Sequence, residues 1–469
     1  MIRLSTCFIA VLLALRSAAM STPAPSKLVP APHRRRTKAS GTATSTFAST
    51  GSGSSTSTES VVPPSESGPV ISLNPNNPVW DSSFTGPFDS IRGPLGATII
   101  GPNNPNIAQQ NPDLLAPPTT DHGSVPNIKW PMSLSHNRLS TGGWAREQNK
   151  MAGVNMRLKP GAIRELHWHK TAEWAYVLKG TTQVTSVDQD GRNFISTVGP
   201  GDLWYFPPGI PHSLQATGDD PDGSEFLLVF PNGMFSEDST FLLTDWLAHI
   251  PAEVLAKNFG LPAEAFKNAP ENELYIFPAE VPADNQPAPT SPFGTVPDPF
   301  AFAFSNVSAT QFSGGTAKIV DSSTFKISVT IAAAEVTVEP GAMRELHWHP
   351  TEDEWTFFLE GEGRITLFAS QSNARTFDFQ AGDVGYIPAS NGHYVENTGN
   401  TTLRFLEIFN SGTPSSAPDK FQDVSLSQWL ALTPPAVVKA HLGVSDDTIA
   451  HFSKTKPVVV GGSRNVTKV

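Results

Sequence analysis

Short runs in which apolar and polar residues alternate recur along most of the chain. Examples are AYVLKG at 175–180, TTQVTSV at 181–187 and RITLF at 364–368, and Gly and Pro residues separate such runs. A period of two is typical of strands, and regularly spaced strands of this kind predict an antiparallel barrel or sandwich. Helical character is confined to two segments, near 244–260 and 427–443. The pattern therefore predicts an all-β fold with a few short helices.

The second half of the chain repeats the first. PGAIRELHWH at 160–169 recurs as PGAMRELHWH at 340–349. The pairs GDLWYFP and GDVGYIP, FLLVF and FLEIF, and DWLAHIP and QWLALTP follow in the same order. A period of about 180 residues is too long for a solenoid and indicates two duplicated domains. Because a helical segment closes each repeat, we expect two tandem β-barrels with short C-terminal helices.

Shifts in composition predict where these domains begin and end. Residues 1–20 combine Arg3 with the apolar run FIAVLLAL and small residues, which predicts a secretory signal peptide and a secreted protein. Residues 21–69 are dominated by Ser, Thr, Gly and Pro, which predicts a propeptide or linker without a packed core. The remaining boundaries are expected as a first domain over 70–277, a Pro-rich linker over 278–299 and a second domain over 300–469.

The charge balance narrows the function classes. The chain has a net charge of −11 with only 16% charged residues, which argues against nucleic-acid or anionic-membrane partners. No later apolar run is long enough to span a membrane. The single cysteine, Cys7, lies in the expected signal peptide, so a metal in the mature chain must be held by His and carboxylates. Glycosylation sequons at Asn306, Asn400 and Asn465 fit a secretory route.

Each repeat carries three histidines and one glutamate that could converge on an ion. Residues two apart on a strand share a face, and the Glu-to-last-His spacing is 39 in both repeats. The Glu follows the second His by four residues in the first copy and by five in the second, so the second copy needs a bulge or a turn adjustment. Nitrogen and oxygen ligands suit Mn²⁺ or Fe²⁺ without choosing between them. The two sets are His167, His169, Glu173 and His212, and His347, His349, Glu354 and His393.

These motifs resemble a known family. The order G-x5-H-x-H-x3-4-E followed by a last His resembles the germin-like cupins, and GAIRELHWHKTAEWAYVLKG and GDLWYFPPGIPHSLQ resemble the bicupin oxalate decarboxylases. The resemblance covers almost the whole chain after residue 70. It implies two cupin (jelly-roll, double-stranded β-helix) barrels, two Mn²⁺ per chain, and dioxygen as a cofactor that is not consumed. It also implies conversion of oxalate to formate and carbon dioxide, and a homo-oligomer, a hexamer in the family.

An arginine stands three residues before the first ligand His of each copy. Side chains an odd number of residues apart point to opposite faces of an ideal strand, so Arg164 and Arg344 would lie off the ligand face. Both, however, lie where the chain enters the strand and the backbone direction is not fixed. A guanidinium there could pair with a carboxylate of the substrate and polarise it. The alternative is a structural salt bridge with Glu165, Glu345 or another acid.

A glutamate in the segment SEDSTF at 236–241 matches the mobile-lid glutamate of the decarboxylases. The resemblance implies that Glu237 accepts the substrate's proton and later protonates the carbon left after carbon dioxide departs. The alternative is a solvated acid in a polar loop. Asp238 stands where the family pattern has Asn, and its charge could alter the balance between decarboxylation and oxidation.

The two copies differ near the metal ligands. Glu407 occupies the place of Leu228, and the resemblance implies a proton donor at the second site. We expect the first site to be the main catalytic centre and the second to be structural or auxiliary. Trp168 and Trp348, between the ligand histidines, should point away from the metal and pack.

Three other functions compete with oxalate decarboxylation. An oxalate oxidase would use the same ligands and release carbon dioxide and hydrogen peroxide. A cupin dioxygenase for a flavonoid-like substrate would need a roomier apolar pocket and no anion-binding arginine. A non-enzymatic storage or sugar-binding bicupin would give no reason for two intact ligand sets.

Overall fold

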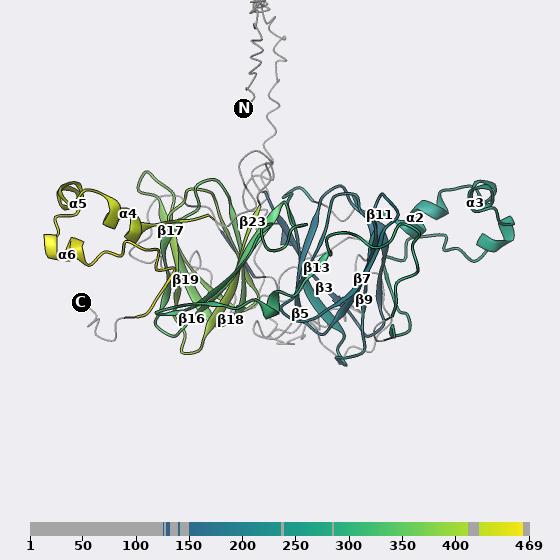
Figure 1. The fold of residues 1–469 in the computed structure, drawn as a ribbon, viewed down its shortest axis with the longest axis horizontal. Coiled ribbons are helices and arrows are strands. Elements are labelled where there is room, and N and C mark those ends of the chain that lie inside the picture. Colours follow the sequence, from purple (N-terminus) through teal and green to yellow (C-terminus); the bar gives the residue numbers. More distant parts are fainter. Residues whose placement is uncertain are drawn as a thin grey trace, which may run out of the picture. The chain divides into compact units, whose positions relative to one another are not determined.

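The computed structural model describes the repeated part of the chain, all of it within one compact unit that runs from Glu66 to Val469. The described residues are 125, 128–131, 139–140, 150–235, 239–283, 286–410 and 422–462. The expected signal peptide and the 21–69 segment lie outside them, as do Glu237 and Asp238. The predicted alternating runs are strands, and two barrels of antiparallel sheet follow one another along the chain (Figure 1).

Two six-stranded sheets form the first barrel, and apolar side chains such as Trp204, Phe226 and Leu214 fill its interior. One sheet contains β13 (Ala301–Phe302), β8 (Leu203–Phe206), β5 (Glu173–Lys179), β10 (Ser224–Phe230), β3 (Ala152–Leu158) and β2 (Leu139–Ser140). The other contains β11 (Phe241–Leu242), β4 (Ile163–Trp168), β9 (His212–Ala216), β6 (Thr182–Val187) and β7 (Asn193–Val198), with β12 (Ile276–Phe277) paired to β4.

The second barrel repeats this arrangement with its own core, which includes Phe358, Phe377 and Phe405. Its larger sheet contains β1 (Lys129–Pro131), β21 (Asp383–Ile387), β18 (Glu354–Glu360), β23 (Leu403–Asn410), β16 (Ile331–Val338), β15 (Gly315–Val320) and β14 (Thr310–Phe312). Its smaller sheet contains β20 (Ala374–Gln380), β19 (Glu362–Phe368), β22 (His393–Asn397), β17 (Met343–Trp348) and β24 (Val424–Ser425), with β25 (Val459–Val460) paired to β17.

The barrels exchange strands and share a core. β1 precedes the first barrel in sequence but pairs with β21 of the second, whereas β13 pairs with β8 of the first. One apolar cluster joins side chains from both, among them Trp174 and Trp355. Trp355 lies so close to Gly153 that a Cβ there would stand 2.4 Å from its ring. Only glycine leaves room for this contact between the barrels.

The two predicted helical segments are helices outside the sheets (Figure 1). The first contains α2 (Leu243–Ala248), α3 (Ala252–Phe259) and the 3₁₀ turn η5 (Ala263–Phe266), and the second contains α4 (Leu426–Leu432), α5 (Pro435–Leu442) and α6 (Asp446–Ala450). Gly260 and Gly443 end α3 and α5 in the left-handed conformation that favours glycine. Within the described residues, no helix is long and apolar enough to cross a membrane.

Candidate metal and substrate site

A bulge in the histidine strand places the first ligand of each set. The register of β4 against β9 shifts between Arg164 and His167, so that His167 faces His212 across the ladder. β17 shifts in the same way between Arg344 and His347. The shift resets the alternation of side chains, which is why an arginine three residues from a ligand can share its side of the strand. The strands end at the tryptophans, so the second histidine of each set lies just beyond the strand rather than on it.

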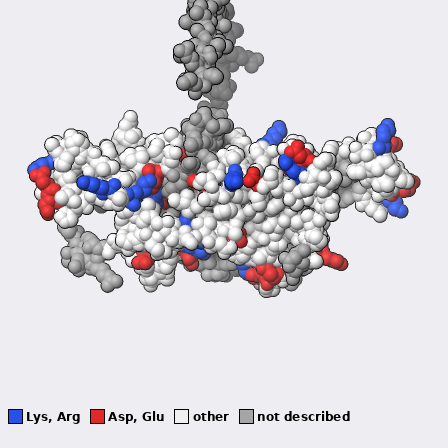
Figure 2. Space-filling model, viewed as in Figure 1, with Lys and Arg blue, Asp and Glu red and all other residues white. Residues whose placement is uncertain are grey.

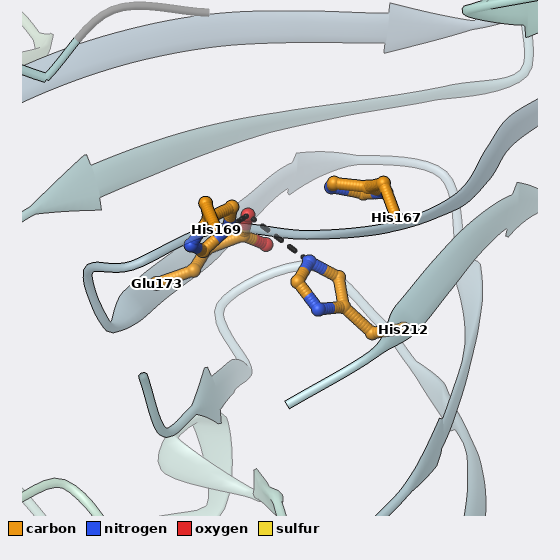
Figure 3. Close-up of side chains that lie close together, drawn as sticks. All are labelled: His167, His169, Glu173 and His212. Carbon is orange, nitrogen blue, oxygen red and sulfur yellow. Dashed lines mark hydrogen bonds and ion pairs between the residues drawn. The ribbon is translucent and has the colours of Figure 1, made fainter. Parts of the chain in front are cut away.

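The structure brings together the four side chains of the first set. Ligand atoms of His167, His169, Glu173 and His212 all lie within 4.8 Å of one another, and all four residues are buried. The Glu173 carboxylate lies 3.2 Å from Nε2 of His169 and 3.5 Å from Nε2 of His212 (Figure 3). Three imidazoles and one carboxylate therefore face a common centre, as the spacing predicts.

Backbone carbonyls fix the orientation of every imidazole in the first set. Nδ1 of His167 donates to the carbonyl of Glu165 at 2.7 Å, and Nδ1 of His169 donates to that of Thr171 at 2.7 Å. Nδ1 of His212 donates to the carbonyl of Ile210 at 2.8 Å. Because a carbonyl only accepts, Nδ1 carries a proton in each ring, and Nε2 is the nitrogen that faces the common centre. This anchoring of the outer nitrogen is typical of metal-binding histidines.

Burial and neighbouring charges favour the metal-binding protonation states. Burial lowers the pKa of His167 well below its usual value, and the charges of His212 and Arg164 lower it further. Burial raises the pKa of Glu173, but bonds from His169 and His212 outweigh it, so the pKa is well below the usual range. Trp204 Nε1 also donates to Glu173, at 2.9 Å. Burial therefore favours a neutral imidazole at His167, and the Glu173 carboxylate is ionised.

The second set converges in the same way, and its extra residue is absorbed in the turn between the strands. His347, His349, Glu354 and His393 are buried with ligand atoms within 4.8 Å. Nδ1 of these histidines donates to Glu345 O, Gln422 O and Asn391 O. Asp353, in the longer turn, accepts from the Tyr386 hydroxyl and the Ala389 amide. Of the two alternatives that the sequence left open, a bulge or a turn adjustment, the structure shows the turn adjustment between His349 and Glu354.

The donor set fits a divalent transition metal in both barrels. Nε2 of His347 is buried and has no hydrogen-bond partner in the described part of the chain. A buried polar atom without a partner is costly, and a metal ion would satisfy it. Glu354 accepts from His349 and His393, and although burial opposes it, these bonds hold its pKa below the usual range.

Arg164 presents a buried positive charge beside the first set. It is 3% exposed, its guanidinium stacks over the Tyr275 ring at 4.0 Å, and Nη1 donates to Tyr275 O at 3.0 Å. Nε has no hydrogen-bond partner, and no ion pair joins Arg164 to any described carboxylate. The alternative of a salt bridge with Glu165 is wrong, because the Glu165 carboxylate is bonded to Thr244, Leu274 and Tyr275. An uncompensated buried guanidinium is suited to binding an anion.

Arg344 differs, because carboxylates already surround it. Its Nε lies 3.1 Å from Glu407 and its Nη2 is bonded to Asp423, while Nη1 is 3.9 Å from Glu345. Burial raises the pKa of Glu407 to about 7, against the opposing charge of Arg344. The alternative of a structural salt bridge is therefore correct for Arg344. Its main partners are Glu407 and Asp423, which are far from it in the sequence.

The tryptophans between the ligand histidines pack, as expected. Trp168 stacks on Phe241 with ring centroids 5.3 Å apart and contacts Trp246 edge-on. Trp348 contacts Trp429 in the same edge-on way. Glu237 lies outside the described residues, so its predicted role stays a prediction.

Neither Tyr275 nor Asp423 was predicted from the sequence. Both lie more than 70 residues from the arginine they contact and outside the repeated motifs. Tyr275 stands directly before β12 and Asp423 directly before β24, and both strands pair with a histidine strand. β12 and β25 pair with equivalent positions of the histidine strands, and so do β11 and β24.

Comparison with known proteins identifies the family. A family model described as Cupin matches residues 145–267 and 303–450. Oxalate decarboxylase OxdC of Bacillus subtilis (strain 168) is 53% identical over 379 residues, which cover 79% of this chain and 96% of that protein. A probable oxalate decarboxylase of Arthroderma benhamiae is 40% identical, covering 78% of this chain and 91% of that protein.

Solved structures agree with the sequence relatives. A structure of Bacillus subtilis oxalate decarboxylase, from a study of its Mn(II) centres, matches with a TM-score of 0.70 and 51% identity. The match covers 79% of this chain and 98% of that one. The prediction of two tandem cupin barrels is confirmed. The chain belongs to the bicupin oxalate decarboxylase family, with a cupin domain in each half.

Proposed function

We propose that this protein is a manganese-dependent oxalate decarboxylase that acts mainly at the first site. The observation that carries the proposal is the pairing of one buried, uncompensated guanidinium, Arg164, with a convergent set of three imidazoles and a carboxylate. A metal and a neighbouring cation together suit a small dicarboxylate. The second site has the ligands but not the free cation, which supports an auxiliary or structural role.

Manganese is the metal we propose, two ions per chain. The ligands His167, His169, Glu173 and His212 would hold one ion, and the equivalent second set the other. The Bacillus subtilis relative has Mn(II) centres. When bound, the metal would supply Lewis-acid and one-electron chemistry, with dioxygen as a cofactor that is not consumed.

The chain's own groups would orient the substrate and move one proton. Arg164 would pair with a carboxylate of oxalate, held in place by its stack on Tyr275. The carbon–carbon bond of hydrogen oxalate breaks, carbon dioxide leaves, and the remaining carbon receives the proton to give formate. Glu237 is the residue we propose to accept and return that proton.

Product analysis tests this proposal. Purified protein would receive manganese and oxalate in aerated, mildly acidic buffer. We expect formate and carbon dioxide in equal amounts and little peroxide, and loss of formate production in Glu237→Ala. Carbon dioxide and peroxide without formate would establish an oxalate oxidase, and Asp238 would be the first residue to exchange. Neither product, with metal bound, would leave a different substrate or a non-enzymatic bicupin.

Secretion and self-association are further proposals about the same enzyme. The signal-peptide pattern supports export, and the sequon residues Asn306 and Asn400 are exposed. Exposed Trp246, Phe259 and Trp429 on the helical segments support a homo-oligomer, with the family's hexamer as the expected form. In the described part of the face in Figure 2, charges of both signs are scattered among uncharged areas, which supports neither nucleic acid nor a membrane as a partner.

A further inference from the structure

The two copies differ in sequence at the position from which Asp423 contacts Arg344. In the first copy, β11 pairs with β4 so that Leu242 faces His167. In the second, β24 pairs with β17 so that Ser425 faces His347. The residue two positions earlier is Thr240 in the first copy and Asp423 in the second. At one equivalent position, therefore, the first site has a neutral side chain and the second an acid.

Asp423 is held firmly beside Arg344. Its carboxylate is fully buried and is bonded both to Nη2 of Arg344 and to Nζ of Lys456. Lys456 also donates to the Asp423 carbonyl, at 2.9 Å. The preceding residue, Gln422, accepts from Nδ1 of the ligand His349, at 2.8 Å. These contacts fix the carboxylate against the arginine at the edge of the second ligand set.

The partner of Asp423 also differs between the copies. Val459 of β25 faces Arg344, and Ile276 of β12 faces Arg164. Counting back three residues places Lys456 of the second copy at the position of Glu273 in the first. The second copy therefore has an acid with a matched cation where the first has neither. Because the first copy has the same fold without the Asp423–Lys456 pair, the fold does not require this pair, and it is specific to the second site.

We propose that the Asp423 carboxylate occupies, beside Arg344, the position that a carboxylate of oxalate takes beside Arg164, and so excludes oxalate from the second site. The inference rests on the proposed function, since it takes oxalate as the ligand of the first site. An anion that enters the second site must displace a buried carboxylate from two cations. Thr240 offers no such competitor.

Reciprocal exchange of the two residues tests this assignment. Asp423→Thr gives the second site the residue of the first, and Thr240→Asp does the reverse. The measurement is equilibrium dialysis of radiolabelled oxalate against manganese-loaded protein in oxygen-free buffer, with the label checked to be unreacted oxalate. We expect one oxalate per chain for the unchanged protein, two for Asp423→Thr, and at least about tenfold weaker binding for Thr240→Asp, because a like charge would face the bound carboxylate.

A matched control separates the site from general effects. Asp378→Thr makes the same change at an exposed Arg364–Asp378 ion pair of the second barrel and should leave one oxalate per chain. Metal content should stay at two ions per chain in all variants, since neither exchanged residue is a ligand. Asp423→Asn keeps the shape of the side chain and replaces Asp423→Thr if that variant does not fold.

The outcomes distinguish failure of the inference from failure of the proposed function. Two oxalates per chain in the unchanged protein, or one in both Asp423 variants with two metals bound, would overturn the role of Asp423. Undiminished binding in Thr240→Asp would also overturn it. If the unchanged protein bound no oxalate and produced no formate, the proposed function itself would be wrong.

Discussion

Arg164 carries a buried charge that only a guanidinium can hold in this position. It both stacks on the face of Tyr275 and donates in plane to the carbonyl of that residue. Lysine has no planar group that could stack on a ring, and its charge is confined to one ammonium group. We therefore expect Arg164→Lys to lower kcat/KM for oxalate by about 100-fold or more, measured as formate produced.

The control for this exchange is another stacked arginine. Arg375 lies over the Phe377 ring at 4.7 Å in the second barrel, away from both ligand sets. Arg375→Lys should keep kcat/KM within about twofold of the unchanged protein, in line with its distance from the chemistry. If Arg164→Lys behaved like Arg375→Lys, substrate orientation by Arg164 would be refuted.

Glu173 is the anionic member of the first ligand set. Contacts with His169 and His212 hold its pKa well below the usual range in spite of burial. Glu173→Gln removes that charge, and metal affinity falls with it. After dialysis, we expect manganese to drop from two ions per chain to one, measured by elemental analysis.

Exchange of an exposed glutamate gives the comparison for this loss. Glu253 lies on α3, outside both barrels, and Glu253→Gln should retain two manganese ions per chain. Retention of two ions by Glu173→Gln would mean that the three imidazoles suffice to hold the metal.

At the level of single residues, the sequence predicted the site residues that belong to a short repeated motif. The spacing of the paired histidines, and that of the glutamate from the last histidine, is the same in both copies, so the eight proposed ligands could be selected without coordinates. The partners of the arginines could not. Tyr275 and Asp423 reach Arg164 and Arg344 only through strands that return after more than 70 residues, and no local period marks them.

At the level of elements, Glu165 ties three segments together. Its carboxylate accepts from the amide and hydroxyl of Thr244, where α2 begins, and from the amides of Leu274 and Tyr275 before β12. Tyr275 has φ of 59°, which is unfavourable for a residue other than glycine. The hydrogen bond that the Tyr275 amide donates to Glu165 holds Tyr275 there. The bond that the Val458 amide donates to Glu345 holds Val458 (φ 51°) in the second copy.

Removal of this carboxylate should loosen the barrel around Arg164. Four groups donate hydrogen bonds to the Glu165 carboxylate. In Glu165→Gln an NH₂ group, which cannot accept, replaces one of its two oxygens, so the free energy of unfolding should fall by about 1.5–3 kcal/mol. Thermal and urea unfolding measure the change. Glu280→Gln, at an exposed position just after β12, should leave stability unchanged. Equal stability of the two variants would mean that water replaces the lost contacts.

Strand alternation predicted the elements well but not their irregularities. The runs at 175–180 and 364–368 are β5 and β19, and both helical segments lie where expected. The bulges in β4 and β17 were not predicted, because an inserted residue leaves the apolar pattern of so short a strand unchanged. They decide the site, since without them Arg164 would lie on the opposite face from His167.

At the level of the whole molecule, a buried ion pair fastens β1 to the second barrel. Lys129 lies 3.2 Å from Asp383, and both side chains are almost fully buried. Burial raises the pKa of Asp383 to about 6, in spite of the charge of Lys129 and a bond from the Gln380 amide. This crossover joins residues far apart in sequence, so neither the strand exchange nor the ion pair was predicted.

The raised pKa sets the sign of the pH dependence. Between the unfolded value of 3.8 and the folded value of about 6, the folded chain binds more protons at Asp383 than the unfolded chain does. The contribution of this group to stability is therefore full below pH 4 and falls as the pH rises to about 6. Asp383→Asn resembles the protonated form at every pH, so it should equal the unchanged protein near pH 4 and exceed it in stability at pH 7.

Urea unfolding at stepped pH values measures the difference between the two proteins, which cancels the contributions of all other titrating groups. Glu362→Gln, at an exposed position of the same barrel, should show no such change in its difference from the unchanged protein between pH 4 and 7. If Asp383→Asn were instead the less stable protein at pH 7, attraction to Lys129 would outweigh the cost of burying the carboxylate. The ion pair would then be a net source of the attachment between β1 and the second barrel.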